Sequence, residues 1–247
     1  MKLTGNTVLI TGGGSGIGRA LAEALHARNN KVVITGRDAK KLTAVVKANP
    51  GIEARELDVT DSAAIKSFAR EATRDFPSLN VLINNAGIMR PEELTSGETD
   101  TAEATISTNL LGPIRLTAAL LPHLLKASRA AVLTVSSGLA FVPRSLAPTY
   151  CATKAAIHSY SQTLRVQLRN TSVQVIELVP PYLQTELLNP SQATDPNAMP
   201  LSDYISETMA LLEANPDAEE ILVRRVSFQR WAEKESRYEA AFARVNN

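Results

Sequence analysis

A tyrosine, a lysine and a serine lie at a spacing that suits proton transfer. Tyr150 and Lys154 are four residues apart in the run Tyr-Cys-Ala-Thr-Lys, and Ser137 precedes the tyrosine by thirteen positions. On a helix of 3.6 residues per turn, side chains four apart project from the same face. A phenol titrates near pH ~10, and a neighbouring ammonium group should lower its pKa by favouring the phenolate. Together the three groups could hold one carbonyl oxygen and exchange a proton with it.

A glycine-rich turn near the N-terminus offers a second kind of chemistry. The segment Thr-Gly-Gly-Gly-Ser-Gly-Ile-Gly, residues 11–18, follows an apolar run and opens a helical one. Glycine allows close backbone approach, and the free N–H groups and dipole of a helix N-terminus attract a pyrophosphate. A flexible loop is the alternative, but the flanking strand and helix favour a dinucleotide site. The expected contacts are Gly12, Gly14, Ser15, Gly16, Ile17 and Gly18.

Strand and helix patterns alternate along the chain and must position these groups. Short β-branched runs predict strands at residues 7–11, 31–35, 52–57, 81–84, 130–136 and 173–179. Helical periodicity fills the intervals, for example at residues 16–28 and 62–75. This alternation predicts an α/β, single-domain, doubly wound Rossmann fold with a central parallel sheet of about seven strands and helices on both faces. Ligands then bind beyond the carboxyl ends of the strands.

The last third of the chain predicts a lid and an extension of the same domain, which covers residues 1–247. Residues 180–200 contain five prolines and no clear periodicity, so residues 181–205 are interpreted as a substrate lid. Residues 206–247 form the C-terminal extension, with helices expected at 201–213 and 228–245 around a short strand near 221–223. An apolar pocket is expected from Leu139, Phe141, Tyr182, Leu183, Leu187 and Leu188.

Composition narrows the classes of partner. The 247 residues contain 26 Lys plus Arg and 25 Asp plus Glu, a balance that predicts no binding to nucleic acid or to a membrane surface. The one cysteine excludes an intrachain disulfide and suits a cytoplasmic location. Neither an export signal nor a membrane span is expected. No spaced His, Cys or carboxylate cluster indicates a metal, and His158 is expected to be a packing or surface residue.

With these motifs in view, the chain resembles the short-chain dehydrogenase/reductase (SDR) family. The family pattern TGxxxGxG, then NNAG, then YxxxK is matched by residues 11–18, by Asn84-Asn85-Ala86-Gly87 and by residues 150–154. The correspondence spans residues 3–190. Within the family, the N-terminal run MKLTGNTVLITG and the tail ILVRRV at residues 221–226 are similar to the DltE-like group of oxidoreductases.

This resemblance implies a catalytic tetrad. Ser137 would hydrogen-bond the substrate oxygen, and Tyr150 would serve as the acid or base. Lys154 would lower the pKa of the tyrosine and hold the nicotinamide ribose. Asn109 resembles the fourth member, which maintains a water-linked proton path through the lysine. Ser136 is the alternative to Ser137, but the interval to the tyrosine favours the second serine.

The resemblance also assigns residues to the adenosine side of a cofactor. Asp58 would lie beside the adenine with Val59 next to it, and the segment Asn85, Ala86 and Gly87 would support the sheet and line the adenosine. Structural alternatives exist for both groups. Asp58 could simply end a strand or cap the following helix, and Asn-Ala-Gly is common in turns.

The end of the second strand predicts which dinucleotide is preferred. Gly36 occupies the place of the usual NAD-selecting aspartate, and Arg37 follows it as a ligand for the 2′-phosphate of NADP(H). Asp38 could bind an NAD ribose instead, although its role as N-cap of the helix beginning at residue 39 is favoured. NADP(H) is therefore the predicted cofactor, with NAD(H) as the alternative.

One departure from the family pattern concerns the loop after the sixth strand. Many members have Pro-Gly there, whereas this chain has Pro180-Pro181. Proline fixes φ and supplies no N–H, so the loop is expected to approach the cofactor differently. Pro180 and Thr185 are its expected cofactor contacts, the threonine at the carboxamide of nicotinamide.

These features predict an NADP(H)-dependent oxidoreductase that transfers a hydride between nicotinamide and a ketone, an aldehyde or the corresponding alcohol. A small carbonyl or alcohol compound is the expected substrate, and a homodimer or homotetramer the expected assembly. A catalytically silent NADP(H)-binding sensor is the alternative, against which the intact Ser, Tyr and Lys set argues. A sugar-nucleotide epimerase would need a larger C-terminal substrate domain than this chain offers.

Overall fold

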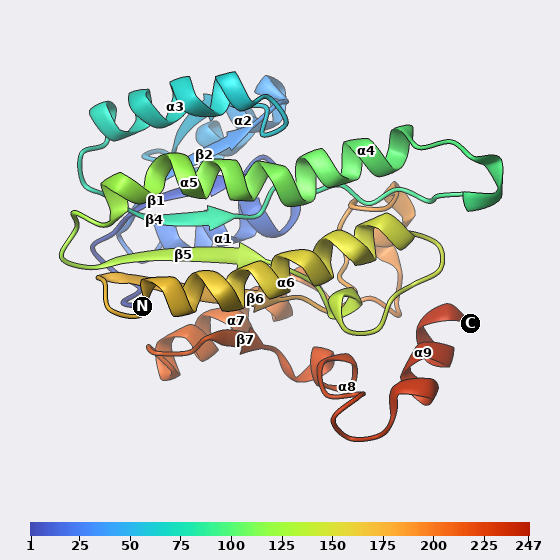
Figure 1. The fold of residues 1–247 in the computed structure, drawn as a ribbon. Helices are drawn as coiled ribbons and strands as arrows, with labels where there is room; N and C mark the ends of the chain where they lie inside the picture. The colour runs from blue at the N-terminus through green and yellow to red at the C-terminus, as the bar shows by residue number, and fades with distance from the viewer.

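A single sheet of seven parallel strands forms the centre of the molecule (Figure 1), and the computed structural model describes all 247 residues. The strand order is β3-β2-β1-β4-β5-β6-β7, and every neighbouring pair is parallel. The strands are β1 (Thr7–Thr11), β2 (Lys31–Gly36), β3 (Glu53–Glu56), β4 (Leu79–Asn84), β5 (Ala130–Val135), β6 (Val173–Val179) and β7 (Glu220–Leu222). The predicted doubly wound Rossmann fold is confirmed.

Helices cover both faces of this sheet (Figure 1). On one face pack α1 (Gly16–His26), α2 (Ala39–Ala48) and α7 (Leu201–Ala214). On the other pack α3 (Ser62–Asp75), α5 (Gly112–Leu124) and α6 (Pro148–Leu168). The remaining helices are α4 (Asp100–Ile106), α8 (Ser227–Arg230) and α9 (Tyr238–Asn246). Because both faces are covered, every residue of β1 and β5 is buried, which explains their continuous runs of aliphatic side chains.

The order of the strands fixes where a ligand can bind. From β1 the chain proceeds outward through β2 to β3, and it then returns to place β4 on the other side of β1. The helices that follow β1 and β4 therefore cover opposite faces of the sheet, and in folds of this type ligands bind at the carboxyl edge beside such a switch point. The glycine-rich turn follows β1, and the Asn-Asn-Ala-Gly segment follows β4. The fold thus brings two of the three sequence motifs to one place.

Aspartate caps define where two of the helices begin. The carboxylate of Asp38 accepts hydrogen bonds from the backbone N–H groups of Lys40 and Lys41, both at 3.0 Å. Asp61 does the same at α3. The expected N-cap role of Asp38 is confirmed, and the cap of α3 belongs to Asp61 rather than to Asp58.

The predicted lid segment is a loop with a closed base. Leu183 and Met199 form an isolated parallel bridge, in which the Gln184 N–H donates to the Met199 carbonyl at 2.9 Å. The loop contains the short 3-10 helix Pro190–Thr194. Helix α7 starts at Leu201, so the expected limit at residue 205 falls inside this helix. In Figure 1 the loop lies beyond the tips of the strands.

The C-terminal helix predicted over residues 228–245 is wrong as one element. The structure has α8 and α9 instead, separated by a turn in which Ser236 has a φ of 55°. The turn allows α9 to fold back, so that the Asn246 amide donates to the Pro143 carbonyl at 3.0 Å. A long-range contact of this kind leaves no local periodic signal. None of the helices combines the length and the apolar character needed to cross a bilayer.

Candidate active site

Three predicted side chains meet at the carboxyl edge of the sheet. Ser137 follows β5, and Tyr150 and Lys154 lie in the first two turns of α6. Glu92 fixes the start of this helix, because its carboxylate accepts from the N–H and the hydroxyl of Thr149 at 3.0 and 2.6 Å. An anion at a helix N-terminus is favoured by the helix dipole. The phenol and the ammonium group are therefore carried by one rigid, capped element.

Burial controls the protonation of the tyrosine and the lysine. Tyr150 and Lys154 are each 5% exposed. Burial raises the pKa of the Tyr150 phenol, and a hydrogen bond with Ser137 opposes that rise. Burial also lowers the pKa of Lys154 to about 8, with the charge of Glu177 acting in the opposite direction. A neutral phenol beside a serine hydroxyl is suited to donate a proton.

The expected lowering of the tyrosine pKa by the lysine is not what this structure produces. The Lys154 ammonium nitrogen lies 5.5 Å from the centre of the Tyr150 ring and donates to the Val135 carbonyl at 2.8 Å. Desolvation of the phenol therefore outweighs the attraction of the cation, which sequence spacing alone does not reveal.

The two candidate serines have different surroundings. The Ser136 hydroxyl donates to the Leu178 carbonyl at 3.4 Å, within the sheet. The Ser137 hydroxyl accepts from the Leu139 N–H at 3.1 Å and adjoins the Tyr150 phenol. The structure thus brings Ser137, and not Ser136, to the tyrosine.

Asn109 lies in a π-helical turn, Ser107–Leu111, between α4 and α5. Its side-chain amide accepts from the Ile88 N–H and donates to the Ile88 carbonyl, both at 2.9 Å, and approaches the Thr153 hydroxyl at 3.4 Å. Asn109 therefore ties the loop after β4 to the residue beside Lys154. Turns of this type are rare and often mark functional sites.

The glycine-rich turn is shaped by close backbone packing. Gly12 and Gly16 have φ values of 66° and 52°, and a Cβ atom on Gly18 would lie 2.4 Å from both the Asn85 amide and the Gly12 carbonyl. The Asn85 amide donates to the Thr11 carbonyl at 2.9 Å, and the Thr11 hydroxyl accepts from the Ala86 N–H at 3.0 Å. The Asn-Ala-Gly segment thus holds the turn in place.

The N-terminus of α1 has no partner from its own N-cap. Ser15 is the N-cap residue, its side chain makes no capping hydrogen bond, and the first turn of α1 contains no acid. Ile17 is half-buried and packs against the core beside this turn. Free N–H groups and a hydroxyl at such a terminus fit a pyrophosphate.

A cavity of about 590 Å³ continues from this turn toward the second strand. Its lining is Gly12, Gly14, Ser15, Gly36, Arg37, Asp38, Ala39, Lys40, Lys41 and Leu42. Arg37 lies 3.8 Å from the Asp58 carboxylate. Asp58 also accepts from the N–H and hydroxyl of Thr60; partial burial raises its pKa, but these bonds and Arg37 hold it below its usual value. Three basic side chains around one cavity suit a phosphate.

The other residues predicted to lie near the adenosine follow β3 and β4. Val59 is buried against Gly112, whose added Cβ atom would lie 3.0 Å from the Val59 carbonyl. Gly87 lies beside the Asn109 amide, at 3.4 Å from an added Cβ atom. Both positions therefore link the carboxyl edge of the sheet to the start of α5 and to the π-helical turn.

The predicted lid segment approaches the glycine-rich turn and the start of α2. A Cβ atom on Gly16 would lie 3.8 Å from the Thr185 methyl group, and the Glu186 carboxylate is 3.9 Å from the Lys41 ammonium nitrogen. Pro180 is buried, and its carbonyl accepts from the Gly138 N–H at 2.9 Å. Pro180 therefore contacts the loop that carries Ser137.

The expected apolar pocket is only partly assembled. Leu139 and Leu188 pack against Met89 and Tyr150, which makes an apolar wall at the phenol. Phe141 instead packs edge-on against His158, with ring centres 4.7 Å apart. Leu183 is buried below the lid, while Tyr182 and Leu187 are exposed. Phe141 is therefore not part of the wall, because it packs against the cluster that contains Val179, Val223 and Val226, at the ends of β6 and β7 and beyond.

Sequence reasoning missed one cluster of charged side chains. His158, Glu177 and Glu220 place ligand-type atoms within 4.8 Å of one another, although no spaced pattern announces them. Arg230 already binds Glu220 in a bidentate pair, at 2.7 and 2.9 Å. The expectation that His158 is a packing or surface residue omitted its bond to Glu177, at 2.7 Å. The pairing of β6 with β7 brings Glu177 beside Glu220, and the packing of α6 on β6 brings His158 to Glu177.

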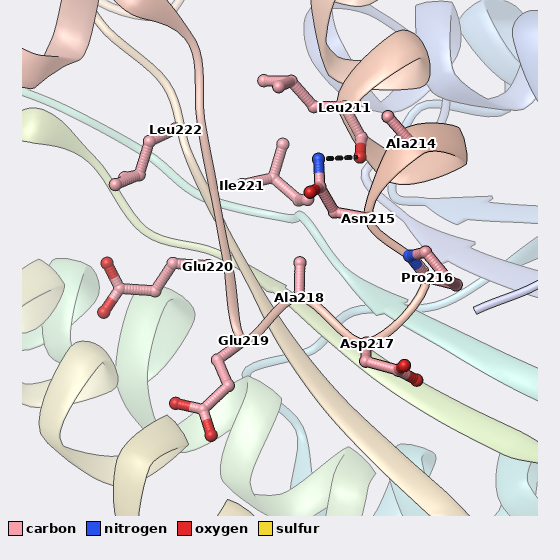
Figure 2. A pocket seen from close by; sticks show the side chains of 10 residues that line it. All are labelled: Leu211, Ala214, Asn215, Pro216, Asp217, Ala218, Glu219, Glu220, Ile221 and Leu222. Carbon is pink, nitrogen blue, oxygen red and sulfur yellow. Dashed lines mark hydrogen bonds between the residues drawn. The ribbon is translucent and has the colours of Figure 1, made fainter.

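A second hollow, of about 530 Å³, lies away from this edge (Figure 2). It is formed by the end of α7 and the segment leading into β7, which lies at the amino end of that strand. Its lining is Leu211, Ala214, Asn215, Pro216, Asp217, Ala218, Glu219, Glu220, Ile221 and Leu222. None of the predicted site residues borders it.

Comparison with known proteins agrees with this geometry. The model of the short chain dehydrogenase family matches residues 6–196, and the chain belongs to that family. DltE of Bacillus subtilis, an uncharacterized oxidoreductase, is 46% identical over 189 residues, which cover 76% of this chain and 75% of DltE. The chain is thus a member of the NAD(P)-dependent dehydrogenases and reductases, near DltE.

Two solved structures share the fold over nearly the whole chain. A short-chain dehydrogenase from Streptomyces avermitilis has a TM-score of 0.84 at 24% identity and covers 99% of this chain and 97% of its own. A short chain dehydrogenase from Burkholderia cenocepacia, in complex with NADP, has a TM-score of 0.82 at 25% identity and covers 100% of both chains.

Proposed function

We propose that this protein transfers a hydride between NADP(H) and a ketone, an aldehyde or the corresponding alcohol. The observation that carries the proposal is the meeting of Ser137, Tyr150 and Lys154 at the same sheet edge as the glycine-rich turn. The bound nicotinamide supplies or accepts the hydride. The chain supplies position, charge and the proton.

The proton is moved by groups on α6 and at the end of β5. In reduction, the neutral Tyr150 phenol donates its proton to the substrate oxygen, while the Ser137 hydroxyl orients that oxygen. The positive charge of Lys154, close to the phenol ring, stabilises the phenolate that remains. Asn109 holds the segment around Thr153, which supports a path for reprotonation. In oxidation the same groups act in reverse.

The proposed cofactor site uses the free N-terminus of α1 for the pyrophosphate and Arg37 for the 2′-phosphate. The cationic cavity beside Gly36 supports NADP(H) over NAD(H), and the Burkholderia cenocepacia relative binds NADP. The complete proposed set is Gly12, Gly14, Ser15, Gly16, Ile17, Gly18, Arg37, Asp58, Val59, Asn85, Ala86, Gly87, Tyr150, Lys154, Pro180 and Thr185.

The substrate is proposed to bind between the Tyr150 wall and the lid of residues 181–205. Leu139 and Leu188 give this wall an apolar character, which favours a hydrophobic carbonyl compound over a polyanionic sugar. We further propose a cytoplasmic location and a homodimer or homotetramer. The exposed apolar side chains Ile106 and Val166, on α4 and α6, are consistent with a subunit contact.

The catalytically silent sensor finds no support, because the reactive side chains are all present and the relatives are oxidoreductases. A screen of NADPH and NADH oxidation over ketones and aldehydes tests the proposal. Steady, carbonyl-dependent NADPH consumption is expected. Binding of NADPH without turnover over a broad panel would revive the sensor.

Tyr150→Phe provides the sharpest test of the proposed acid. We expect kcat to fall about 10²- to 10⁴-fold, because the variant has no proton to donate, while the Kd for NADPH stays within a few-fold of the parent. Tyr160→Phe is the matched control, since Tyr160 lies on the same helix but packs in the core behind it. Activity of Tyr150→Phe close to the parent would contradict the assignment.

A further inference from the structure

Glu177 is an acid in the middle of a buried parallel strand. It lies on β6, its side chain is fully buried at 0% exposure, and its Oε1 atom has no hydrogen-bond partner. Its other oxygen, Oε2, is 2.7 Å from Nδ1 of His158. A buried carboxylate is costly unless nearby charges or hydrogen bonds compensate it. The buried carboxylate of Glu177 has a single hydrogen bond.

The direction of the strands points Glu177 at the catalytic helix. Its neighbours in alternation, Val173 and Val175, belong to the core beneath α6, so Glu177 faces the same side. On α6, His158 follows Lys154 by one helical turn. Glu177 therefore lies beneath the turn of α6 that joins Lys154 to His158.

Five other charged or titratable side chains surround this carboxylate. They are Lys154, His158 and Arg165 from α6, Glu220 from β7 and Arg230 from α8. Glu220 is the direct neighbour of Glu177 in the sheet register, and in Figure 2 it leaves β7 on the side opposite to Ile221.

The two arginines near Glu177 already have other hydrogen-bond partners. Arg230 takes both oxygens of Glu220. Arg165 donates to the carbonyls of Val175 and Glu219, at 3.1 and 2.9 Å. The negative charge of Glu177 thus acts on His158, which is partly exposed, on Lys154, which is buried, and on Arg230, which is also held by Glu220.

Lys154 needs an anion of this kind. Its ammonium group is buried, its one hydrogen bond is to the Val135 carbonyl, and it makes no ion pair. Burial lowers its pKa to about 8, and Glu177 is the group whose charge opposes that fall. Without a nearby anion, burial would favour a neutral lysine at still lower pH.

We propose that Glu177 is a positioning residue for catalysis, a buried carboxylate oriented by His158 that keeps Lys154 protonated. This inference rests on the proposed function, because the charge of Lys154 matters only if the Tyr150 phenolate must be stabilised. The three-residue cluster is not proposed as a metal site, since Arg230 occupies both oxygens of Glu220.

A titration of the lysine in the cofactor-free chain tests this inference without any turnover. The protein is labelled with lysine carrying ¹³C at Cε, and the Lys154 signal is assigned by its absence from Lys154→Arg. The parent midpoint is expected near pH 8. Because loss of a neighbouring anion favours the neutral amine, Glu177→Gln should lower the midpoint by about one pH unit. An unchanged midpoint would overturn the inference.

Glu220→Gln is the matched control, because it removes one negative charge from the adjacent register position. Its carboxylate is held by Arg230, so the Lys154 midpoint is expected to stay at the parent value. An equal fall in Glu220→Gln and Glu177→Gln would indicate a general field effect and would contradict a specific role for Glu177. Glu177→Leu, similar in volume and without polar atoms, repeats the test if the glutamine variant does not fold.

The pH profile of carbonyl reduction gives a second measurement. The alkaline limb of kcat is expected to move to lower pH by about one unit in Glu177→Gln, which is a roughly tenfold loss at pH values above both limbs. Glu177→Asp, which keeps the charge, should restore most of the shift. If the parent shows no reductase activity, the proposed function fails while the NMR result still stands. If the parent reduces carbonyls and both readouts are unchanged in Glu177→Gln, only the role of Glu177 fails.

Discussion

The glycine-rich turn after β1 and the proposed lid after β6 lie beside each other at the carboxyl edge of the sheet, yet they are built in opposite ways. The turn is fixed by backbone conformation, because Gly12 and Gly16 have positive φ and Gly18 leaves no space for a Cβ atom. The lid is fixed by side chains, above all by the buried amide of Gln192. A motif of glycines can thus be recognised from a few residues, whereas the contacts that hold the lid segment together could not be predicted from its sequence.

Gln192 illustrates how side chains replace backbone constraints in the lid. Its amide donates to the Leu183 carbonyl at 2.8 Å and to the Thr185 hydroxyl at 3.2 Å, and it accepts from the Leu188 N–H at 3.0 Å. One side chain therefore satisfies three groups from different parts of the loop. If the turn depends on backbone packing and the lid on side-chain hydrogen bonds, substitutions in the two regions should have different effects.

Gly18→Ala should have the largest effect, because it disrupts the backbone packing of the turn. The added methyl group would overlap the Asn85 amide and the Gly12 carbonyl. We expect the free energy of unfolding to fall by about 3 kcal/mol or more and NADPH binding to be lost, measured by thermal denaturation and fluorescence titration. Gly36→Ala is the stability control, since its Cβ atom would meet Leu42 at an ordinary 3.6 Å. Equal stability of the two variants would remove the proposed distinction.

Arg37→Ala sharpens the comparison by leaving the turn intact and removing one side chain at its border. Loss of a charge-assisted contact to the 2′-phosphate should raise the Kd for NADPH about 10- to 100-fold. The Kd for NADH should change little, because NADH lacks that phosphate. Arg55→Ala, an exposed arginine on the neighbouring strand β3, controls for the loss of net charge. Equal weakening of both dinucleotides would exclude Arg37 as the phosphate ligand.

Gln192→Leu should have the smallest effect and should stay within the lid. Leaving the Leu183 carbonyl and the Leu188 N–H without their partner costs about 1–3 kcal/mol of local stability. Hydrogen exchange at residues 183–199 should accelerate, and the KM for the carbonyl substrate should rise a few-fold, while amides of the central sheet keep their protection. Gln174→Leu, at the half-buried second position of β6, is the matched control. Faster exchange in the sheet as well would mean that the lid is not an independent unit.

The central fold and much of the site were predictable because their signals are local. Strand and helix alternation predicted the sheet, and Asp38 stands directly before the helical segment that begins at residue 39, where an N-cap residue is expected. Tyr150 and Lys154 share one helix, so their proximity follows from spacing alone. The meeting of Ser137 with Tyr150 required the fold, although the family pattern implied it.

Other features could not be predicted because they depend on distant contacts or on burial. The pKa of Tyr150 is raised where spacing to the lysine suggested the reverse, since spacing does not report desolvation. Glu177 and Glu220 are far apart in sequence and become neighbours only through the pairing of β6 with β7. Phe141 packs on His158 instead of lining the expected pocket, which depends on how α6 and the sheet pack together.

The bridge between Leu183 and Met199 has a consequence for how new specificities can arise. It joins the two ends of the intervening segment, so that this segment begins and ends at neighbouring positions in the structure. Closure entropy rises slowly with added length, by only about 0.6 kcal/mol per doubling. The segment between the two bridge residues can therefore be replaced by one of different sequence or length, by evolution or by grafting, while the strands of the central sheet keep their course.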